Sequence, residues 1–341
     1  MIPPRPHRWR LAVAILAASG AALGADPARA ETRLKIATLA PEGSTWVSGL
    51  RALDHELQAN TARRVGLRVY PGGVQGDDPA ILDSAQAGRL DGAALTGVGM
   101  GRLVAWSRVL ELPFQLDGRA EAAALRAHLD AELRAAFAAK GWAVLGWLEV
   151  GPLYLFSRDE IRRPGDLASA RPWVLPGDPF AARLLADLGA AAVELPLGKV
   201  REALARGKLD TVYHAPAACL ALQWSDKVRF MLGLPLAVGA GLLAVRESSL
   251  AELAPADRAA LVEIAGAAAA RIIDETARVN RAARETLLGS GMRVVELAPP
   301  EVAAFRAAGW NAARALAGTG PDALFTSSLL QRVERRLRAG R

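Results

Sequence analysis

Hydrophobic and polar residues follow two alternating patterns along the first part of the chain. The stretch "LKIATLA" at 34–40 alternates like a short strand, and "WVSGLRALDHELQAN" at 46–60 carries apolar residues at helical spacing. The next strand is expected in "VGLRVYPGG" at 65–73, followed by a helix over 78–88. A further strand, at 90–96, runs into a glycine-rich segment. Alternating strands and helices predict an α/β fold with parallel strands.

A similar order of strands and helices returns in the second half of the chain. A helix is expected over 121–141, followed by strands at 142–150 and 153–157. The predicted elements that follow are a short strand in "RPWVLPG" (171–177), a helix over 178–189, a strand in "AAVELP" (191–196), a helix passing into a strand over 197–216, and an apolar segment at 237–248. Residues 255–291 read as one long helix or a bent pair, before a short strand and two terminal helices.

Two segments of the chain echo each other. "AQAGRLDGAAL" at 85–95 and "LARGKLDTVYH" at 204–214 each contain a helix, a glycine stop, Leu-Asp and an apolar strand. Ligands in open α/β sheets bind beyond the carboxyl ends of such strands. A chance match of a few residues is the alternative, but the position of each copy in its half favours a duplication. The echo predicts two similar lobes that present loops to a shared cleft.

The amino-terminal segment has the pattern of a secretory signal peptide. Three arginines within the first ten residues precede an apolar run at 11–25 and an A-x-A cleavage site at 28–30. The alternative is an uncleaved membrane anchor, which needs about 20 uninterrupted apolar residues, and Asp26 and Arg29 interrupt the run too soon. We therefore expect residues 1–30 to be a cleaved signal peptide and the mature protein to reside in the periplasm.

Charge and cysteine content exclude several classes of protein. Four arginines and one aspartate of the predicted signal peptide account for +3 of the net charge of +7, which leaves +4 on the mature chain. The arginines lie on Ala-rich amphipathic helices without interleaved aromatics, so no nucleic acid is expected. Cys219 is the only cysteine and reads as a small buried hydrophobe. The four histidines lack metal-ligand spacing, and we expect neither a metal nor a cofactor.

Catalytic motifs do not emerge from the sequence. It contains no G-x-S-x-G elbow, no H-E-x-x-H and no Walker loop, and "GVGMGR" at 97–102 reads as a tight loop where backbone approaches a ligand or a helix. We therefore expect a ligand-binding protein and not an enzyme. The alternatives are an exported enzyme, for which His214 with Ser225 or Cys219 would be the reactive pair, and an assembly factor that has lost its ligand.

Several motifs together resemble those of the DctP-type solute-binding proteins of TRAP transporters. They are "KIATLAPEGSTW", "RVYPGGVQGDDP", "AGRLDGAALTGVGMGR", "VLELPF", "LDTVYHAP" and "ALQW…KV". The similarity extends from about Leu34 to past Leu253 and is greatest to the TatP-like branch, whose transporter works with a tetratricopeptide-repeat partner. The resemblance implies a two-lobed periplasmic-binding-protein (Venus-flytrap) fold. Each lobe would be a mostly parallel sheet flanked by helices, and a long helix would connect the lobes.

The resemblance also implies a division into lobes and a mechanism. Lobe I would comprise residues 31–150 plus about 239–280, and lobe II residues 151–238 plus about 281–341. The lobes would close around one small molecule, and the closed receptor would deliver it to the membrane subunits of a TRAP permease.

The same resemblance singles out two positions where this chain departs from the family. Most members end the strand after "DL-x-G-x-K" in an arginine that pairs with a substrate carboxylate, and the matching residue here is Trp173. A second family cation falls at Leu153. Arg171 is an alternative cation, although strand alternation points it away from Trp173. Burying a carboxylate without a positively charged partner costs on the order of several kcal/mol. Because both family cations are replaced by apolar residues, these departures predict a largely hydrophobic ligand.

The expected binding site is a pocket with one wall formed by Trp173. Its companions in the second half are expected to be Trp147, Leu153, Tyr154, Tyr213, His214 and Trp224. From the first half, residues at or just beyond the carboxyl ends of strands are expected to line it: Leu39, Ala40, Ser44, Trp46, Gly72 and Thr96. For Trp224 a role in the hydrophobic core is an equal alternative, and for Trp106, Trp142 and Trp310 the core is preferred.

Overall fold

The computed structural model describes Met1 and residues 31–318, 320 and 323–339, so the predicted signal peptide lies outside the described part of the chain. The strands are β1 (Thr32–Thr38), β2 (Val65–Tyr70), β3 (Gly92–Thr96), β4 (Trp142–Ser157), β5 (Trp173–Val174), β6 (Val193–Glu194), β7 (Thr211–His214), β8 (Phe230–Leu232), β9 (Ala237–Arg246) and β10 (Arg293–Val295). Among the described residues, no helix is long and apolar enough to cross a bilayer.

Most of the helices occupy intervals that the sequence pattern indicates, but those at 97–103 and 216–221 were not predicted. The helices are α1 (Thr45–Asn60), α2 (Asp78–Gln86), α3 (Gly97–Leu103), α4 (Arg119–Ala138), α5 (Pro179–Asp187), α6 (Val200–Ala205), α7 (Pro216–Ala221), α8 (Glu247–Ala251), α9 (Pro255–Gly289), α10 (Pro299–Ala315) and α11 (Ser327–Ala339). Short 3-10 turns are η1 (Ala105–Glu111), η2 (Pro164–Ser169) and η3 (Leu197–Lys199). The glycine-rich segment predicted as a loop is the helix α3, which is a correction to the sequence analysis.

The strands form one eight-stranded mixed sheet and a separate pair. The order in the large sheet is β10-β8-β4-β9-β3-β1-β2, with β7 also paired to β4, and β5 pairs with β6 in the small sheet. β1 is parallel to β2 and β3, as expected. β9 runs antiparallel to both β3 and β4, and β4 runs antiparallel to β7 and β8. The large sheet is thus mixed and not mostly parallel, because β4 and β9 are long strands that return against their neighbours, whereas β5 and β6 of the small sheet are parallel.

Strand β4 joins the two ends of the large sheet. It is one 16-residue strand where the sequence predicts two, and it pairs first with β9 and then with β7 and β8. The register of the β4–β9 ladder shifts between Glu149 and Gly151, and Gly151 has a φ of 96°. A glycine adopts this conformation without the steric cost that a side chain would bring. This register shift lies next to the predicted lobe boundary at residue 150. The lobe boundaries themselves stay a prediction.

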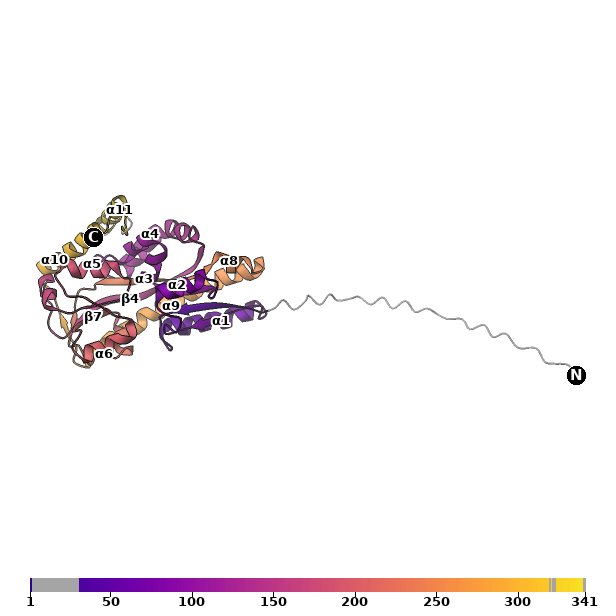
Figure 1. The fold of residues 1–341 in the computed structure, drawn as a ribbon, viewed down its shortest axis with the longest axis horizontal. Coiled ribbons are helices and arrows are strands. Elements are labelled where there is room, and N and C mark those ends of the chain that lie inside the picture. The colour runs from indigo at the N-terminus through magenta and orange to yellow at the C-terminus, as the bar shows by residue number, and fades with distance from the viewer. Residues whose placement is uncertain (2–30, 319, 321–322, 340–341) are drawn as a thin grey trace. The chain divides into compact units, whose positions relative to one another are not determined.

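The large sheet is buried on both faces around strand β9. Successive residues of β9 belong alternately to two clusters: Leu242 and Ala244 to one, Leu243 and Val245 to the other. The first cluster includes apolar residues of α2 and α4, and the second includes those of α1 and α9. Successive side chains of a strand point to opposite faces, so the sheet is a layer between two sets of helices (Figure 1).

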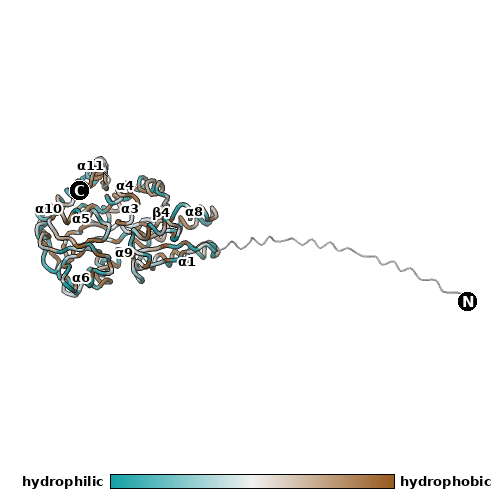
Figure 2. The backbone as a smooth tube through the Cα atoms, viewed as in Figure 1, coloured by the Kyte–Doolittle hydropathy of each residue, from teal (hydrophilic) through white to brown (hydrophobic). Residues whose placement is uncertain are grey.

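Helix α9 is a single 35-residue helix, which decides between the two alternatives left open by the sequence. Proline stands in its first turn, where the missing N–H costs nothing, and its buried positions recur at helical spacing. Hydrophilic and hydrophobic residues alternate over short distances throughout the folded part of the chain (Figure 2). The helix packs against α1 and β4 at one end of the sheet and against α7 at the other, so it bridges the two halves.

The internal echo is visible in the hydrogen bonds of its two aspartates. The backbone N–H of Asp91 donates to the carbonyl of Lys35, and the N–H of Lys35 donates to the Asp91 carboxylate. Asp210 and Arg171 exchange the same two hydrogen bonds. The backbone carbonyls of the two aspartates also have matching donors. The carbonyl of Asp91 accepts from the N–H of Arg246 at the end of β9, and that of Asp210 accepts from the N–H of Arg158 just after β4. The two copies therefore fold alike, and β1 in one corresponds to the β5 segment in the other.

Candidate functional site

Two adjoining cavities lie at the carboxyl ends of β3 and β7. The larger has a volume of about 630 Å³ and the smaller about 120 Å³. Five residues line both: Thr96, Val150, Trp173, Leu175 and His214. These ends are where ligands bind in open α/β folds, so the two cavities are the candidate site.

Trp173 is the wall between the cavities. Its side chain is 2% exposed, and its indole N–H donates to the carbonyl of Leu195 at 2.7 Å. The ring stacks on Tyr213 with centroids 5.2 Å apart and meets Trp224 edge-on at 5.5 Å. Because its only polar atom is bonded within the protein, Trp173 presents only apolar ring surface to the cavities.

The predicted site residues divide between the two cavities and the surrounding protein. Leu39, Ala40, Ser44 and Trp46 line the larger cavity, Leu153 and Tyr213 line the smaller, and Thr96, Trp173 and His214 line both. Four predicted residues line neither cavity: Gly72, Trp147, Tyr154 and Trp224. Nine of the thirteen thus lie together around the candidate site.

The two tryptophans among the remaining four are core residues. Trp147 donates its indole N–H to Asp130 and packs edge-on against Phe137, in the cluster of α4. Trp224 is fully buried and lies behind Trp173 and His214. Both indoles fill the hydrophobic core; this corrects the prediction for Trp147 and, for Trp224, selects the alternative that the sequence left open.

Tyr154 and Gly72 are excluded from the cavities by local backbone geometry. Leu153 and Leu155 line the smaller cavity, and Tyr154 between them points to the opposite face of β4, where its hydroxyl bonds to Arg284. Gly72 has a φ of 67° in the turn after β2, and its N–H donates to the carbonyl of Ala40. Its part is to form the turn that supports the segment lining the larger cavity.

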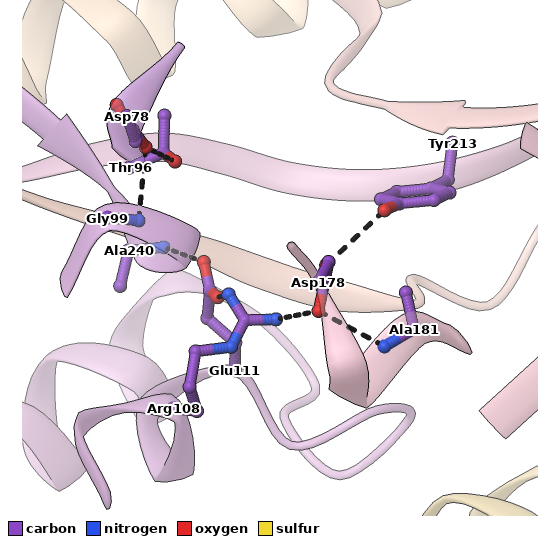
Figure 3. Close-up of polar contacts among 9 residues, drawn as sticks. All are labelled: Asp78, Thr96, Gly99, Arg108, Glu111, Asp178, Ala181, Tyr213 and Ala240. Carbon is purple, nitrogen blue, oxygen red and sulfur yellow. Dashed lines mark hydrogen bonds and ion pairs between the residues drawn. The ribbon is translucent and has the colours of Figure 1, made fainter. Parts of the chain in front are cut away.

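A buried charged group lines the smaller cavity, and the sequence analysis did not identify it. The guanidinium of Arg108 donates to Glu111 at 2.5 Å and to Asp178 at 2.9 Å, and all three side chains are at most 9% exposed (Figure 3). Asp178 is also the N-cap of α5, where it accepts from the N–H of Ala181. Asp178 also accepts a hydrogen bond from the hydroxyl of Tyr213, at 3.4 Å. In the sequence, these three residues are recognisable only as charges within apolar segments. That Asp178 lies against Arg108 and Glu111 could not be predicted, because it belongs to a distant element.

The glycines of α3 make room for these buried charges. A methyl group at Gly97 would lie 1.9 Å from the Glu111 carboxylate, and one at Gly101 would lie 2.8 Å from the Arg108 side chain. Both distances are shorter than a carbon atom can tolerate. The close approach expected for "GVGMGR" is therefore an approach of a helix to side chains of the protein itself.

A further buried carboxylate lies beside α3. Asp78 is 1% exposed and accepts from the Thr96 hydroxyl at 2.5 Å and from the N–H of Gly99 at 3.0 Å (Figure 3). Burial raises the pKa of Asp78 to about 6. Its Oδ1 atom is buried and has no hydrogen-bond partner among the described residues. Since Thr96 commits its hydroxyl hydrogen to Asp78, the Thr96 oxygen acts only as an acceptor toward the cavities.

The candidate nucleophile and base are not suited to chemistry at neutral pH. The imidazole Nδ1 of His214 accepts from the N–H of Ala215, and burial lowers the His214 pKa to about 4. Burial raises the pKa of the Cys219 thiol to about 12, so it holds its proton. Cys219 is the small buried residue that the sequence predicts.

Arg171, the alternative cation, does not reach the cavities. Its guanidinium is about half exposed and pairs with Asp210 at 3.2 Å, while the neighbouring Trp173 faces inward. The remaining lining cations are Arg108, in the buried group, and Arg271, which pairs with Glu56 at 2.7 Å. Each arginine near the site therefore already has a carboxylate.

The site and fold correspond to a known family of receptors. Residues 36–317 match the model of the bacterial extracellular solute-binding proteins of family 7, DctP. The chain belongs to this family. A solute-binding protein of Chromohalobacter salexigens is 24% identical over 253 residues, which cover 73% of this chain and 74% of that protein. An uncharacterized protein of Sinorhizobium fredii is 30% identical over 199 residues, 58% of this chain but only 37% of the relative.

Solved structures of TRAP periplasmic solute-binding proteins share the fold. One from Roseobacter denitrificans, with bound β-D-glucuronate, has a TM-score of 0.77 at 20% identity and covers 83% of this chain and 94% of its own. One from Pseudomonas aeruginosa, with bound L-malate, has a TM-score of 0.76 at 18% identity and covers 83% and 99%. The predicted two-lobed fold with its bridging helix is thus confirmed.

Family membership also establishes the general role of this chain. It is a bacterial extracellular solute-binding protein, of a family that binds solutes and catalyses no reaction. A small-molecule ligand is its implied partner.

Proposed function

We propose that this receptor binds a small, largely hydrophobic ligand that has no free carboxylate. The observation that carries the proposal is Trp173, at the position where the resemblance to the family implies a carboxylate-binding arginine. The indole is buried, is anchored by its N–H and forms a wall of both cavities. The indole presents an apolar surface to both cavities, and apolar surface of a ligand that is removed from water there contributes about 25 cal/mol per Å² to its affinity.

The charges around the cavities support the same conclusion. Arg108 and Arg271 line the cavities, and each is held by carboxylates of the protein. An acidic ligand in the smaller cavity would lie beside Glu111 and Asp178, whose negative charges repel it, and the exposed Arg271–Glu56 pair contributes only about 0–1 kcal/mol. The relatives with bound β-D-glucuronate and L-malate take acids. In this chain, the indole of Trp173 stands where the resemblance implies the arginine that would bind such an acid.

The proposed mechanism is closure of two lobes around the ligand. Arg108 lies in the predicted lobe I and Asp178 in the predicted lobe II, and the cavities are lined from both. Contacts from both lobes favour the closed member of an open–closed equilibrium, and the permease would bind the closed form. A tetratricopeptide-repeat partner stays a prediction, which co-purification from the native cell would test.

A series of straight-chain alcohols tests the ligand class. By isothermal titration calorimetry, affinity should rise about fourfold per added CH₂, since each buried CH₂ contributes about 0.8 kcal/mol, until the cavity is filled. D-Glucuronate and L-malate should bind more weakly than the best alcohol. Tighter binding of either acid than of every alcohol would refute the proposal.

Two tryptophan variants separate a ligand contact from a core role. Trp173→Phe and Trp224→Phe alter neighbouring buried indoles of the same cluster, but only Trp173 lines the cavities. Trp173→Phe should change the dependence of affinity on alcohol length, and Trp224→Phe should change stability alone. Identical binding curves for both variants and the wild type would show that Trp173 is only a core residue.

A further inference from the structure

The smaller cavity carries an excess of negative charge. One guanidinium, that of Arg108, faces two buried carboxylates, those of Glu111 and Asp178. The other potential cation in the lining is His214, and burial lowers its pKa to about 4, so it is neutral near pH 7. The protein therefore places two buried negative charges beside one positive charge.

Hydrogen bonding fits the ionised form of both carboxylates. In Glu111, Oε1 accepts from the N–H of Ala240 at 2.7 Å and Oε2 accepts from Arg108 at 2.5 Å (Figure 3). Asp178 accepts from Arg108, from the N–H of Ala181 and from Tyr213. A proton on Glu111 would face N–H donors and would need an acceptor. Burial raises the pKa of Glu111, and Arg108 and the N–H of Ala240 oppose that rise.

Asp78 affects the lining indirectly, through Thr96. It is a buried carboxylate that lines neither cavity. It receives the hydroxyl hydrogen of Thr96, which leaves the Thr96 oxygen as an acceptor in the lining of both cavities. Acceptors and excess negative charge are complementary to a ligand that donates hydrogen bonds and is positively charged.

Aromatic rings form much of the rest of the smaller cavity. Trp173, Tyr213, Phe114 and Phe180 line it together with the carboxylates. Aromatic faces attract cations, and aromatic walls combined with carboxylates are suited to ammonium groups that carry apolar substituents. At about 120 Å³, against roughly 10–15 Å³ per water on this measure, the cavity has space for a group of several heavy atoms.

We propose that the smaller cavity binds a cationic nitrogen of the ligand, so that the receptor takes an apolar amine or ammonium compound. The inference rests on the proposed function, since it requires that the ligand occupy these cavities, and it adds the sign of the ligand's charge. The protein supplies the counter-charge through Glu111 and Asp178 and the apolar contact through the aromatic walls.

Three probes of one shape and different charge test the inference. They are tert-butylammonium, tert-butanol and pivalate, measured against the full mature chain by ligand-observed NMR titration at pH 7. We expect tert-butylammonium to bind at least tenfold more tightly than tert-butanol, and pivalate to bind weakest. Equal affinity of the ammonium and the alcohol, or no binding of the ammonium, overturns the inference while leaving an uncharged apolar ligand possible. Tightest binding of pivalate overturns the proposed function as well.

Carboxylate variants test which residues supply the negative charge. Glu111→Gln should reduce the preference for ammonium over alcohol to less than threefold. Glu149→Gln is the matched control, because Glu149 is a buried carboxylate that pairs with Arg126 at 2.9 Å and lines neither cavity. It should leave the preference unchanged. Should Glu111→Gln fail to fold, Asp178→Asn provides the same test, since its amide oxygen retains the cap of α5. An unchanged preference in the folded variant contradicts the inference.

Discussion

Gly97 is a position where one methyl group should disturb the candidate site. An added Cβ would lie 1.9 Å from Oε2 of Glu111 and 2.3 Å from its carboxyl carbon. Glu111 cannot move aside freely, because Ala240 and Arg108 hold its two oxygens. Overpacking costs about 1–3 kcal/mol, and a lost hydrogen bond to a buried charge costs about 1.5–3 kcal/mol. We therefore expect Gly97→Ala to lower the free energy of unfolding by about 2.5–6 kcal/mol, the sum of these two effects.

Gly266→Ala is the matched control for this prediction. Gly266 also lies in a helix, but the nearest atom to an added Cβ is the carbonyl oxygen of Leu145 at 3.8 Å, an ordinary contact. Replacing a helical glycine by alanine there should stabilise the protein by about 0.5–1 kcal/mol. Urea unfolding followed by circular dichroism measures both variants. If Gly97→Ala proved as stable as Gly266→Ala, the close packing of α3 on Glu111 would be wrong.

Three further predictions concern other parts of the structure. The depressed pKa of His214 means that the unfolded chain takes up a proton first, so the wild type should lose about 3 kcal/mol of stability relative to His214→Gln as the pH drops from 6.5 to 4, as urea titrations of both proteins at several pH values would show. Asp91→Ala and Asp210→Ala should each cost about 1–3 kcal/mol, because each removes the acceptor of a backbone N–H; a neutral result in either would contradict the structural equivalence of the two copies. Trp173→Ala should cost about 3–5 kcal/mol in the ligand-free protein, and a loss below about 1 kcal/mol in thermal unfolding would show that the indole is not packed as described.

Much of the fold could be predicted because its signals are local. The helical spacing of α1, the turn glycines and the Leu-Asp echo each depend on a few consecutive residues. The mixed direction of the strands could not be read in this way. It depends on which strands β4 and β9 meet, and a buried strand has the same apolar pattern in either direction.

The candidate site was predicted only where strand ends locate it. Trp173, Thr96 and His214 stand at such ends and line both cavities. Trp147 is aromatic, as many pocket residues are, but the alternation of side chains along β4 points it into the hydrophobic core. Arg108 was missed because its partner Asp178 is 70 residues away, and nothing local shows that a surface-type residue is buried between two carboxylates.

The most direct test of the central claim is native mass spectrometry of the receptor purified from its own cell, followed by denaturation to release and identify the bound molecule. The structure predicts a small molecule with substantial apolar surface and no free carboxylate, of a mass that fits the two cavities. Release of a uronate or a dicarboxylate would contradict the claim that an indole has taken the place of carboxylate recognition.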